Sequence, residues 1–323
     1  MDKSQLASVD IVIPVYNASQ SIRYCIDAVL TQSHKNFRMI LIDDGSTDGS
    51  FDICEEYAKR YPNIKLVHQN NSGVSAARNQ GLNLVKADFF TFIDSDDLIY
   101  SSCVSDLVDA ALEHDSDLVT ANIFRTKNIH DRVPGNDVNL AYDIAASTAI
   151  EELLYGRRIK NHPVARLYRS DKLSSVRFDE TISIGEDMDY TFRCLRKVNK
   201  VTLVDKVLYN YINKEGSAMN SNFTATRADS FRAARKIYEA TGGGDASISK
   251  LFDEAFAIAT LARPHRNSFE KIYIECSRVS KKLAFQVFCN SKVRLRQRVY
   301  AFLVILNVDL ALLIAGVKRR FRG

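Results

Sequence analysis

The chain has 323 residues, of which 46% are hydrophobic, and it contains six cysteines. This size allows a large core plus an appended domain, and the absence of a set of long apolar spans excludes a membrane-embedded protein with several spans. No C-x-x-C and no metal-ligand spacing occurs among the cysteines, which favours buried, reduced thiols over disulfides or a cysteine-bound metal. The formal net charge of +5 is unevenly distributed along the chain. Residues 263–323 carry 14 Lys/Arg and 3 Asp/Glu, whereas residues 1–262 carry 30 Lys/Arg and 36 Asp/Glu.

The first hundred residues alternate between predicted strands and predicted helices. Strands are expected over residues 9–14, 37–43, 64–68 and 88–93, and helices over residues 19–32, 47–61 and 74–86. Mostly apolar strands that alternate with helices indicate a parallel sheet covered on both faces. Ligands of such sheets bind beyond the carboxyl ends of the strands.

Candidate ligand-binding residues follow all four predicted strands. They are Pro14, Tyr16 and Asn17, then Asp43 and Asp44, then Asn71, and finally Asp94, Ser95 and Asp96. No G-x-G-x-x-G follows the first strand and no G-x-x-x-x-G-K-[ST] occurs, which argues against a dinucleotide-binding oxidoreductase and excludes a P-loop enzyme. The sequence therefore predicts an acidic nucleotide site at one edge of the sheet.

Three carboxylates, Asp94, Asp96 and Asp97, end the apolar run 89–93. Carboxylates at the tip of a buried strand repel one another and are costly to desolvate unless a cation lies between them. Mg²⁺ or Mn²⁺ holding a diphosphate is the natural partner, because these ions take carboxylate and phosphate oxygens as ligands. The structural alternative is that Asp96 or Asp97 caps a helix that starts near Leu98.

Four motifs occur in the order and spacing of a known family. They are I-V-I-P-V-Y-N from Ile11, D-D-G-S-T-D-G-S from Asp43, N-x-G-V-S-A-A-R-N-Q-G-L from Asn71 and D-S-D-D from Asp94. Over roughly residues 8–215 the chain resembles the family 2 (GT-A fold) glycosyltransferases. The resemblance implies an α/β, GT-A (Rossmann-like) nucleotide-sugar-binding domain with a mixed, mostly parallel sheet. It also implies an inverting reaction and a need for Mn²⁺ or Mg²⁺.

The resemblance assigns roles to the residues at the sheet edge. Around the base and ribose it places Pro14, Tyr16, Asp43, Asn71 and Arg78, and near the diphosphate and metal it places Asp94 and Asp96. The expected nucleotide-sugar-binding set also includes Asn17, Asp44 and Ser95. Arg78 lies near a predicted helix start, where a cation is poorly placed for the helix dipole, and this misfit favours an acidic or phosphate-bearing partner. Asp44, Thr47 and Asp48 have an alternative role, given equal weight, as turn and N-cap residues of the next helix.

A second acidic cluster, Glu186-Asp187-Met188-Asp189-Tyr190, opens another predicted helix. Acidic residues in a first helical turn are ordinary on dipole grounds alone. In the family, however, Glu-Asp-x-x-[Phe/Tyr] occupies the position of the acceptor-side base. The resemblance therefore implies that Asp187 is the general base and that Glu186 orients the acceptor or replaces Asp187 in that role.

Two departures from family patterns bear on the reaction. Family members often carry an Arg where this chain has residues 212–214, and Lys214 is a candidate substitute that contacts the diphosphate as a point charge. The membrane-embedded, processive synthases of the family carry Q-x-x-R-W, whereas this chain contains no Trp. The resemblance therefore implies a non-processive transferase.

The region after residue 220 is predicted to be helical, with helices over about 223–240, 248–262 and 269–288. We therefore expect a GT-A catalytic domain over residues 1–220 and a helical C-terminal region over residues 221–323. In that region, the basic segment 292–298 precedes an 18-residue apolar run, Tyr300–Val317. An interfacial membrane segment is favoured, and packing on the protein or a second subunit and a membrane span are the alternatives.

These features predict an enzyme that transfers a sugar from a nucleotide-sugar, with UDP as the expected nucleotide, to a hydroxyl of a glycan or lipid-linked glycan acceptor in surface polysaccharide or lipooligosaccharide biosynthesis. An anionic membrane surface is the expected partner of residues 292–323, nucleic acid is not, and a homo-oligomer is possible. No signal peptide is visible, so a cytoplasmic, peripheral location at the inner face of the cell membrane is expected. The alternative function is a catalytically silent nucleotide-sugar-binding scaffold recruited through its basic tail.

Overall fold

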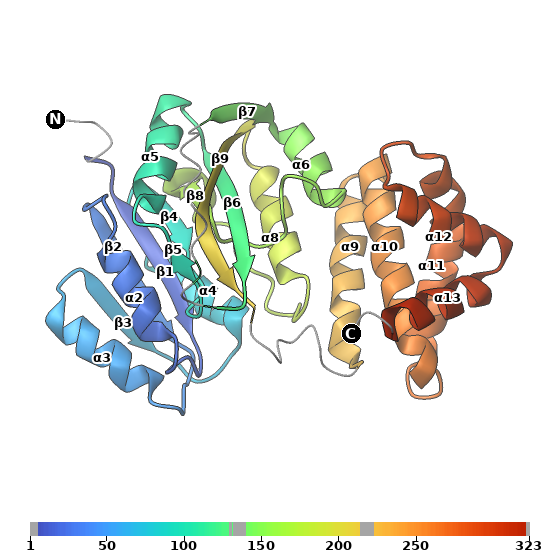
Figure 1. Cartoon of the computed structure of the whole chain (residues 1–323), viewed down its shortest axis with the longest axis horizontal. Helices are drawn as coiled ribbons and strands as arrows, with labels where there is room; N and C mark the ends of the chain where they lie inside the picture. The colour runs from blue at the N-terminus through green and yellow to red at the C-terminus, as the bar shows by residue number, and fades with distance from the viewer. Residues whose placement is uncertain (1–5, 129–130, 132–139, 214–222, 321–323) are drawn as a thin grey trace. The chain divides into compact units, whose positions relative to one another are not determined.

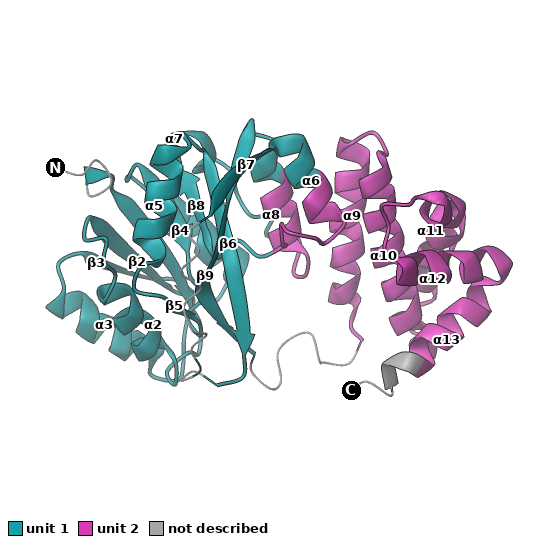
Figure 2. Cartoon of the chain, turned by 45° about the horizontal axis from the view of Figure 1, so that its top comes forward, with its two compact units in different colours: residues 1–150, 162–180, 193–219 teal, residues 151–161, 181–192, 220–323 magenta. Residues whose placement is uncertain are grey.

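The computed structural model describes residues 6–128, 131, 140–213 and 223–320. These residues form two compact units (Figure 2). Unit 1 comprises residues 1–150, 162–180 and 193–219, and unit 2 comprises residues 151–161, 181–192 and 220–323. The chain therefore enters unit 2 for the last time at residue 220, but two earlier segments also belong to that unit.

Unit 1 is built around a nine-stranded mixed sheet (Figure 1). Its strands are β1 (Val9–Val15), β2 (Phe37–Asp43), β3 (Ile64–His68), β4 (Phe89–Phe92), β5 (Leu98–Ile99), β6 (Leu118–Thr126), β7 (Ala141–Ala145), β8 (Arg166–Arg169) and β9 (Lys200–Ile212). The strand order is β3-β2-β1-β4-β8-β6-β9-β5, and β7 pairs with β9. The predicted α/β class with a mixed sheet is confirmed.

The first four strands form the parallel part of the sheet, as the apolar runs predict. β1 pairs in parallel with β2 and β4, and β2 pairs in parallel with β3. Every residue of β1 is buried, so both faces of this strand are covered. The register places Val15 opposite Asp43, and Asp43 opposite His68. The carboxyl ends of these strands therefore meet at one edge.

Helices flank the sheet of unit 1 (Figure 1). They are α2 (Ile22–Leu30), α3 (Ser50–Arg60), α4 (Val74–Asn83), α5 (Cys103–Glu113) and the short α7 (Ser170–Leu173). The approach of α4 to β1 requires a glycine, because a Cβ at Gly81 would lie 2.2 Å from Cγ1 of Val12. This close approach fixes the first turns of α4 next to the carboxyl edge of the sheet.

The segment directly after the acidic cluster is a strand, whereas the structural alternative requires a helix there. Leu98 and Ile99 form the short strand β5, which pairs antiparallel with Asn210 and Tyr209 of β9, and the next helix starts only at Cys103. The idea that Asp96 or Asp97 caps a helix starting near Leu98 is therefore wrong. A two-residue strand has too little pattern of its own to be recognised, because its pairing partner lies more than a hundred residues away in the chain.

Unit 2 is helical. Its elements are η2 (Ala225–Ala228), α9 (Asp229–Ala240), α10 (Asp245–Ala262), η3 (Arg263–His265), α11 (Glu270–Cys289), α12 (Leu295–Leu306) and α13 (Val308–Arg320). Two further helices, α6 (Ala146–Leu154) and α8 (Glu186–Leu195), contain residues of both units. α10 is the central helix of unit 2, because it contacts α9, α11 and α13 and is buried along most of its length.

The apolar run 300–317 is not one helix. Asn307 adopts an extended conformation, with φ −159° and ψ 113°, and ends α12. Its side-chain Oδ1 accepts a hydrogen bond of 3.0 Å from the backbone N–H of Leu310 and so caps α13. Asp309 accepts a 2.7 Å bond from the hydroxyl of Tyr273 on α11. Within the described residues, no helix has the length and apolar character needed to cross a membrane.

All six cysteines are free thiols, as their spacing predicts. Five of them are buried, and Cys289 at the end of α11 is exposed. Lys214, the candidate for a contact with the diphosphate, lies outside the described residues.

Candidate active site

A cavity of about 400 Å³ lies at the carboxyl edge of the parallel strands. Its lining comes from β1, from the loops after β2, β3 and β4, and from the first turns of α4. The lining residues are Pro14, Val15, Tyr16, Asp44, Asn71, Gly73, Val74, Ala77, Arg78, Asp94, Ser95 and Asp96. The volume lies in the range of small-ligand pockets. Of the predicted nucleotide and metal residues, only Asn17 and Asp43 do not line the cavity.

An ion pair between Arg78 and Asp94 lies in the wall of this cavity. Nη2 of Arg78 is 2.9 Å from Oδ1 of Asp94, and the two side chains are 5% and 26% exposed. The Arg78 guanidinium also lies over the ring of Phe178, 5.2 Å from its centroid. The Arg78 side chain, which is poorly placed for the dipole of its own helix, therefore has an acidic partner in Asp94 and an aromatic partner in Phe178. The pair keeps one oxygen of Asp94 engaged and fixes the carboxylate at the cavity wall.

Asp44 organises the loop that follows β3. Its Oδ1 accepts hydrogen bonds from Nε2 of Gln69 (2.7 Å) and from the N–H of Ser72 (2.9 Å), and its Oδ2 accepts one from the N–H of Gly73 (2.8 Å). The adjacent Gly45 has φ +73°, and a Cβ there would lie 2.7 Å from the backbone nitrogen of Asn71. The D-D-G motif therefore brings Asn71 to the cavity through a carboxylate clamp and a close backbone approach.

Asp48 acts as a turn residue. Its carboxylate accepts hydrogen bonds from the N–H of Ser50 (3.1 Å) and of Ser19 (3.0 Å). Desolvation of the Asp48 carboxylate disfavours its charged form, although the residue is exposed, but the bonds from Ser50 and Ser19 outweigh this cost and lower its pKa. Of the two interpretations of the D-D-G-S-T-D turn, Asp48 fits the structural one, whereas Asp44 both clamps a loop and lines the cavity.

Asn17 and Asp43 do not belong to the cavity lining. Asn17 has φ 46°, and its Oδ1 accepts a 2.9 Å bond from the N–H of Thr47, so it ties the loop after β1 to the loop after β2. Oδ2 of Asp43 lies 2.7 Å from Nδ1 of His68. Its Oδ1 is buried, and no donor within the described part of the chain lies within hydrogen-bond distance. A buried acceptor of this kind is suited to an N–H or O–H of a ligand.

Asp97 links the acidic cluster to β9, a role that the sequence did not reveal. Its Oδ2 accepts a 2.8 Å bond from the hydroxyl of Tyr209, and its Oδ1 accepts one of 2.8 Å from the N–H of Ile212. The Tyr209 oxygen in turn accepts a 3.1 Å bond from the N–H of Asp94. Burial, followed by the charges of Asp94 and Asp96, raises the pKa of Asp97 to about 8. Asp97 is therefore part of the support of the cluster and is not free to bind a cation.

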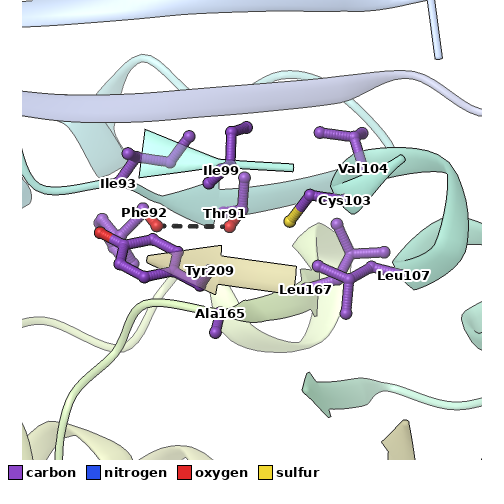
Figure 3. Close-up of a pocket in the computed structure, with 10 residues that line it drawn as sticks. All are labelled: Thr91, Phe92, Ile93, Ile99, Cys103, Val104, Leu107, Ala165, Leu167 and Tyr209. Carbon is purple, nitrogen blue, oxygen red and sulfur yellow. Dashed lines mark hydrogen bonds between the residues drawn. The ribbon is translucent and has the colours of Figure 1, made fainter. Parts of the chain in front are cut away.

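The structure behind Tyr209 is closely packed. A second pocket there has a volume of only about 10 Å³ and is lined mainly by apolar side chains of β4, α5 and β8 (Figure 3). A void of this size holds one water at most. The ring of Tyr209 lies against this packed region, so its hydroxyl has a fixed position between Asp94 and Asp97.

The cavity fits a cation only with help from a ligand. Asp94 and Asp96 both line it, and the described residues contain no group of three or more His, Cys, Asp or Glu side chains arranged to hold a metal. Mg²⁺ is commonly held by one or two carboxylates together with substrate phosphates. The residues therefore fit an ion shared with a diphosphate and do not fit a metal bound by the protein alone.

The predicted base residues belong to the other unit. Glu186 and Asp187 open α8, and both belong to unit 2. The preceding Gly185 has φ +95°, and a Cβ there would lie 3.0 Å from Cα of Ser230, so a larger residue would strain the start of this helix. Nothing in the geometry of unit 1 tests the assignment of Asp187 as the base, and it stays a prediction.

The fold and the cavity together define a nucleotide-binding α/β domain of the GT-A type. The parallel strands carry an acidic rather than a glycine-rich ligand site at their carboxyl ends, and a helical region follows. The chain belongs to glycosyl transferase family 2, because the model of that family matches residues 10–173.

Curated relatives and solved structures agree with this family. "Glycosyltransferase GlyA" of Streptococcus pneumoniae is 31% identical over 216 residues, which cover 65% of this chain and 31% of that protein. "Minor teichoic acid biosynthesis protein GgaA" of Bacillus subtilis is 35% identical over 208 residues, which cover 62% of this chain and 46% of that protein. The chain thus spans less than half the length of both relatives.

A crystal structure of S. aureus TarS residues 1–349 in complex with UDP-GlcNAc has the same fold. Its TM-score is 0.70 at 19% sequence identity, and the match covers 97% of this chain and 92% of that one. The likeness extends over the sheet of unit 1 and the helices that follow, so the helical C-terminal region is also part of the shared fold.

Proposed function

We propose that this protein transfers a sugar from a nucleotide-sugar, with UDP as the nucleotide, to a hydroxyl of a glycan or lipid-linked glycan in surface polysaccharide biosynthesis. The observation that carries the proposal is the cavity whose wall combines Arg78, Asp94 and Asp96 at the carboxyl edge of a parallel sheet. The binding of UDP-GlcNAc by TarS supports a UDP-sugar, and the role of GgaA in minor teichoic acid biosynthesis supports a surface polymer as the product.

The donor is bound by groups on the loops around the cavity. Tyr16 is half-exposed and offers a ring face to the base. We assign the buried Oδ1 of Asp43, which has no donor among the described residues, as the acceptor of an N–H of a uracil, and this contact requires the donor to reach past the cavity lining. Asn71 adds an amide that can donate to a hydroxyl of the ribose. Asp96 and Asp94 would hold Mn²⁺ or Mg²⁺ together with the diphosphate, and the ion supplies charge neutralisation to the leaving group.

The transfer step requires one proton acceptor from the protein. The acceptor hydroxyl oxygen forms a bond to the anomeric carbon, its proton passes to the carboxylate of Asp187, and the bond from the anomeric carbon to the diphosphate oxygen breaks. The nucleoside diphosphate leaves with the electron pair. Attack from the face opposite the leaving group inverts the anomeric configuration, and no covalent enzyme intermediate is formed.

The proposal is tested by a thermal-shift panel of nucleotide-sugars, each measured with and without Mn²⁺, followed by a transfer assay with the donor that binds. A ligand at about 100 times its Kd stabilises the folded protein by about 2.7 kcal/mol, which gives a clear shift. A Mn²⁺-dependent shift with one UDP-sugar, together with transfer that Asp187→Asn abolishes, is the expected result. A shift without any transfer or hydrolysis would favour the silent scaffold, and no shift with any nucleotide would refute donor binding.

The location of the protein in the cell is part of the same proposal. A lipid-linked acceptor would bring the enzyme to the inner face of the cell membrane as a peripheral protein.

A further inference from the structure

An apolar stripe runs along the solvent-exposed side of α12. Its members are Leu295, Val299, Phe302 and Leu306, which are 74%, 49%, 43% and 65% exposed. The spacing of four, three and four residues places them on one face of the helix. The opposite face carries Ala301 and Val304, which are fully buried in unit 2. α12 is therefore apolar on the side that faces water as well as on the side that packs.

The exposed apolar surface continues on both neighbouring helices. α13 contacts α12 and carries its own exposed stripe, formed by Leu310, Leu313 and Val317. On α11, Phe285 is 67% exposed. It lies one turn before Phe288, whose ring centroid is 5.4 Å from that of Phe302 on α12. Exposed apolar side chains on three successive helices, each of which contacts the next, are typical of an interaction site on a protein surface.

The segment that carries this surface is mainly basic. Residues 276–317 contain seven Lys/Arg and a single acidic residue, Asp309, although Glu270 and Glu275 lie in the first turns of α11 and Lys292 is paired with Glu151. Arg296 and Arg298 fall on opposite flanks of the α12 stripe on a helical wheel, and Lys281 and Lys282 are exposed one turn before Phe285. Long basic side chains beside an apolar stripe are the pattern of a helix that lies in the interface of an anionic bilayer.

A second copy of the chain is the main competing occupant. Two identical surfaces would bring the same basic side chains against one another, and like charges at close range oppose association. An anionic bilayer has the opposite charge and accepts apolar side chains at shallow depth. The charge pattern therefore selects the bilayer.

We propose that the exposed stripes of α12 and α13, together with Phe285, form a docking surface for an anionic lipid bilayer. The surface lies flat on the membrane and does not cross it, since Asn307 divides the apolar run into two short helices. The inference deepens the membrane location in the proposed function by assigning it to named side chains. It does not depend on the sugar-transfer reaction itself.

Sedimentation of the full chain with lipid vesicles tests the proposal. Wild-type protein is expected to bind vesicles that contain phosphatidylglycerol and not vesicles of phosphatidylcholine alone. The variant Leu295→Gln/Leu306→Gln removes two exposed side chains and is expected to weaken binding by at least about tenfold. The variant Lys281→Glu/Lys282→Glu is expected to bind more weakly than wild type, and the difference from wild type should grow as the ionic strength falls, because the lost electrostatic attraction is then least screened.

Leu112→Gln/Leu140→Gln is the matched control, because it removes two exposed leucines of unit 1 and should bind vesicles within about twofold of wild type. The proposal is overturned if wild-type protein ignores phosphatidylglycerol, or if the α12 variant binds as well as the control. It is also overturned if wild-type protein is an oligomer that the α12 variant dissociates, since a second copy then covers the surface. Thermal shift by the UDP-sugar is measured for every variant, so failure of docking is separated from failure of donor binding.

Discussion

Single residues at the cavity divide into those that face it and those that hold others in place. Arg78, Asp94 and Asp96 line the cavity, whereas Asp97 and Asn17 bind neighbouring loops and strands. The sequence motif contains both kinds without distinguishing them. A substitution at either kind can weaken donor binding, so each prediction at this scale includes a measurement of the fold.

Replacement of Arg78 by Met should destabilise the protein and abolish donor binding. It leaves the Asp94 carboxylate without its partner, at a cost of about 3 kcal/mol, the lower end for a broken buried pair because Asp94 is a quarter exposed. Urea unfolding and UDP-sugar thermal shift measure the two effects. Arg38→Met is the control, because it breaks the bidentate pair with buried Asp10 outside the cavity lining. Equal loss of donor binding in both variants would show that the effect is only structural.

Asp97 should make the protein less stable as pH rises. Its pKa is about 8 in the folded protein and about 4 in an unfolded chain, so the folded state holds an extra proton between these values. The stabilisation is complete below about pH 4 and is lost as the pH rises through about 8. We expect Asp97→Asn to reduce the fall in Tm between pH 5 and pH 8, measured without divalent cations. An unchanged pH profile would show that Asp97 is already ionised in the fold.

At the scale of elements, the strands with a strong apolar pattern could be predicted and the short or distant ones could not. β2 and β3 match their predicted ranges, 37–43 and 64–68, because each is a short segment rich in β-branched and other apolar residues and is bounded by polar residues. β5 has only two residues and depends on β9, and the bond from Asp97 to Ile212 depends on the same distant strand. Sequence reasoning therefore found most of the cavity lining but not the strand that supports the acidic cluster.

The packing of α4 on β1 gives a prediction at the same scale. Gly81→Ala places a methyl group 2.2 Å from Cγ1 of Val12 and should cost about 1–3 kcal/mol of unfolding free energy. Gly244→Ala is the control, since a Cβ there meets no atom within 4 Å and its φ is −64°. Adding Val12→Ala to Gly81→Ala removes the clash and should recover part of the loss. If Gly81→Ala is as stable as the control, α4 moves away from β1 without cost.

At the scale of the whole molecule, the charge division in the sequence corresponds to a division of structure. The acidic portion contains the sheet and its cavity, and the basic end of the chain forms α11, α12 and α13. Composition alone predicted an anionic partner for the basic end. The choice of residues for that contact needed the structure, because the apolar run reads as one segment until Asn307 is seen to divide it.

The distribution of thiols gives a prediction for the intact chain. Burial raises the pKa of Cys25, Cys54, Cys103 and Cys276, which keeps these thiols protonated and unreactive. Cys289 is the exposed one of the six. Titration with a thiol reagent under native conditions should therefore show about one fast-reacting thiol per chain, and all six after denaturation. Cys289→Ser should remove the fast phase, and a fast phase that survives this change would show that a buried thiol becomes accessible.

The position of Cys289 has a practical consequence. This thiol ends α11, four residues after Phe285 and one after Phe288, so it lies at the border of the surface assigned to the bilayer. The natural chain therefore carries a chemical handle where contact with lipid would change the polarity around a dye. A polarity-sensitive fluorophore attached there would report the arrival of the protein at a vesicle in real time, with no engineered cysteine.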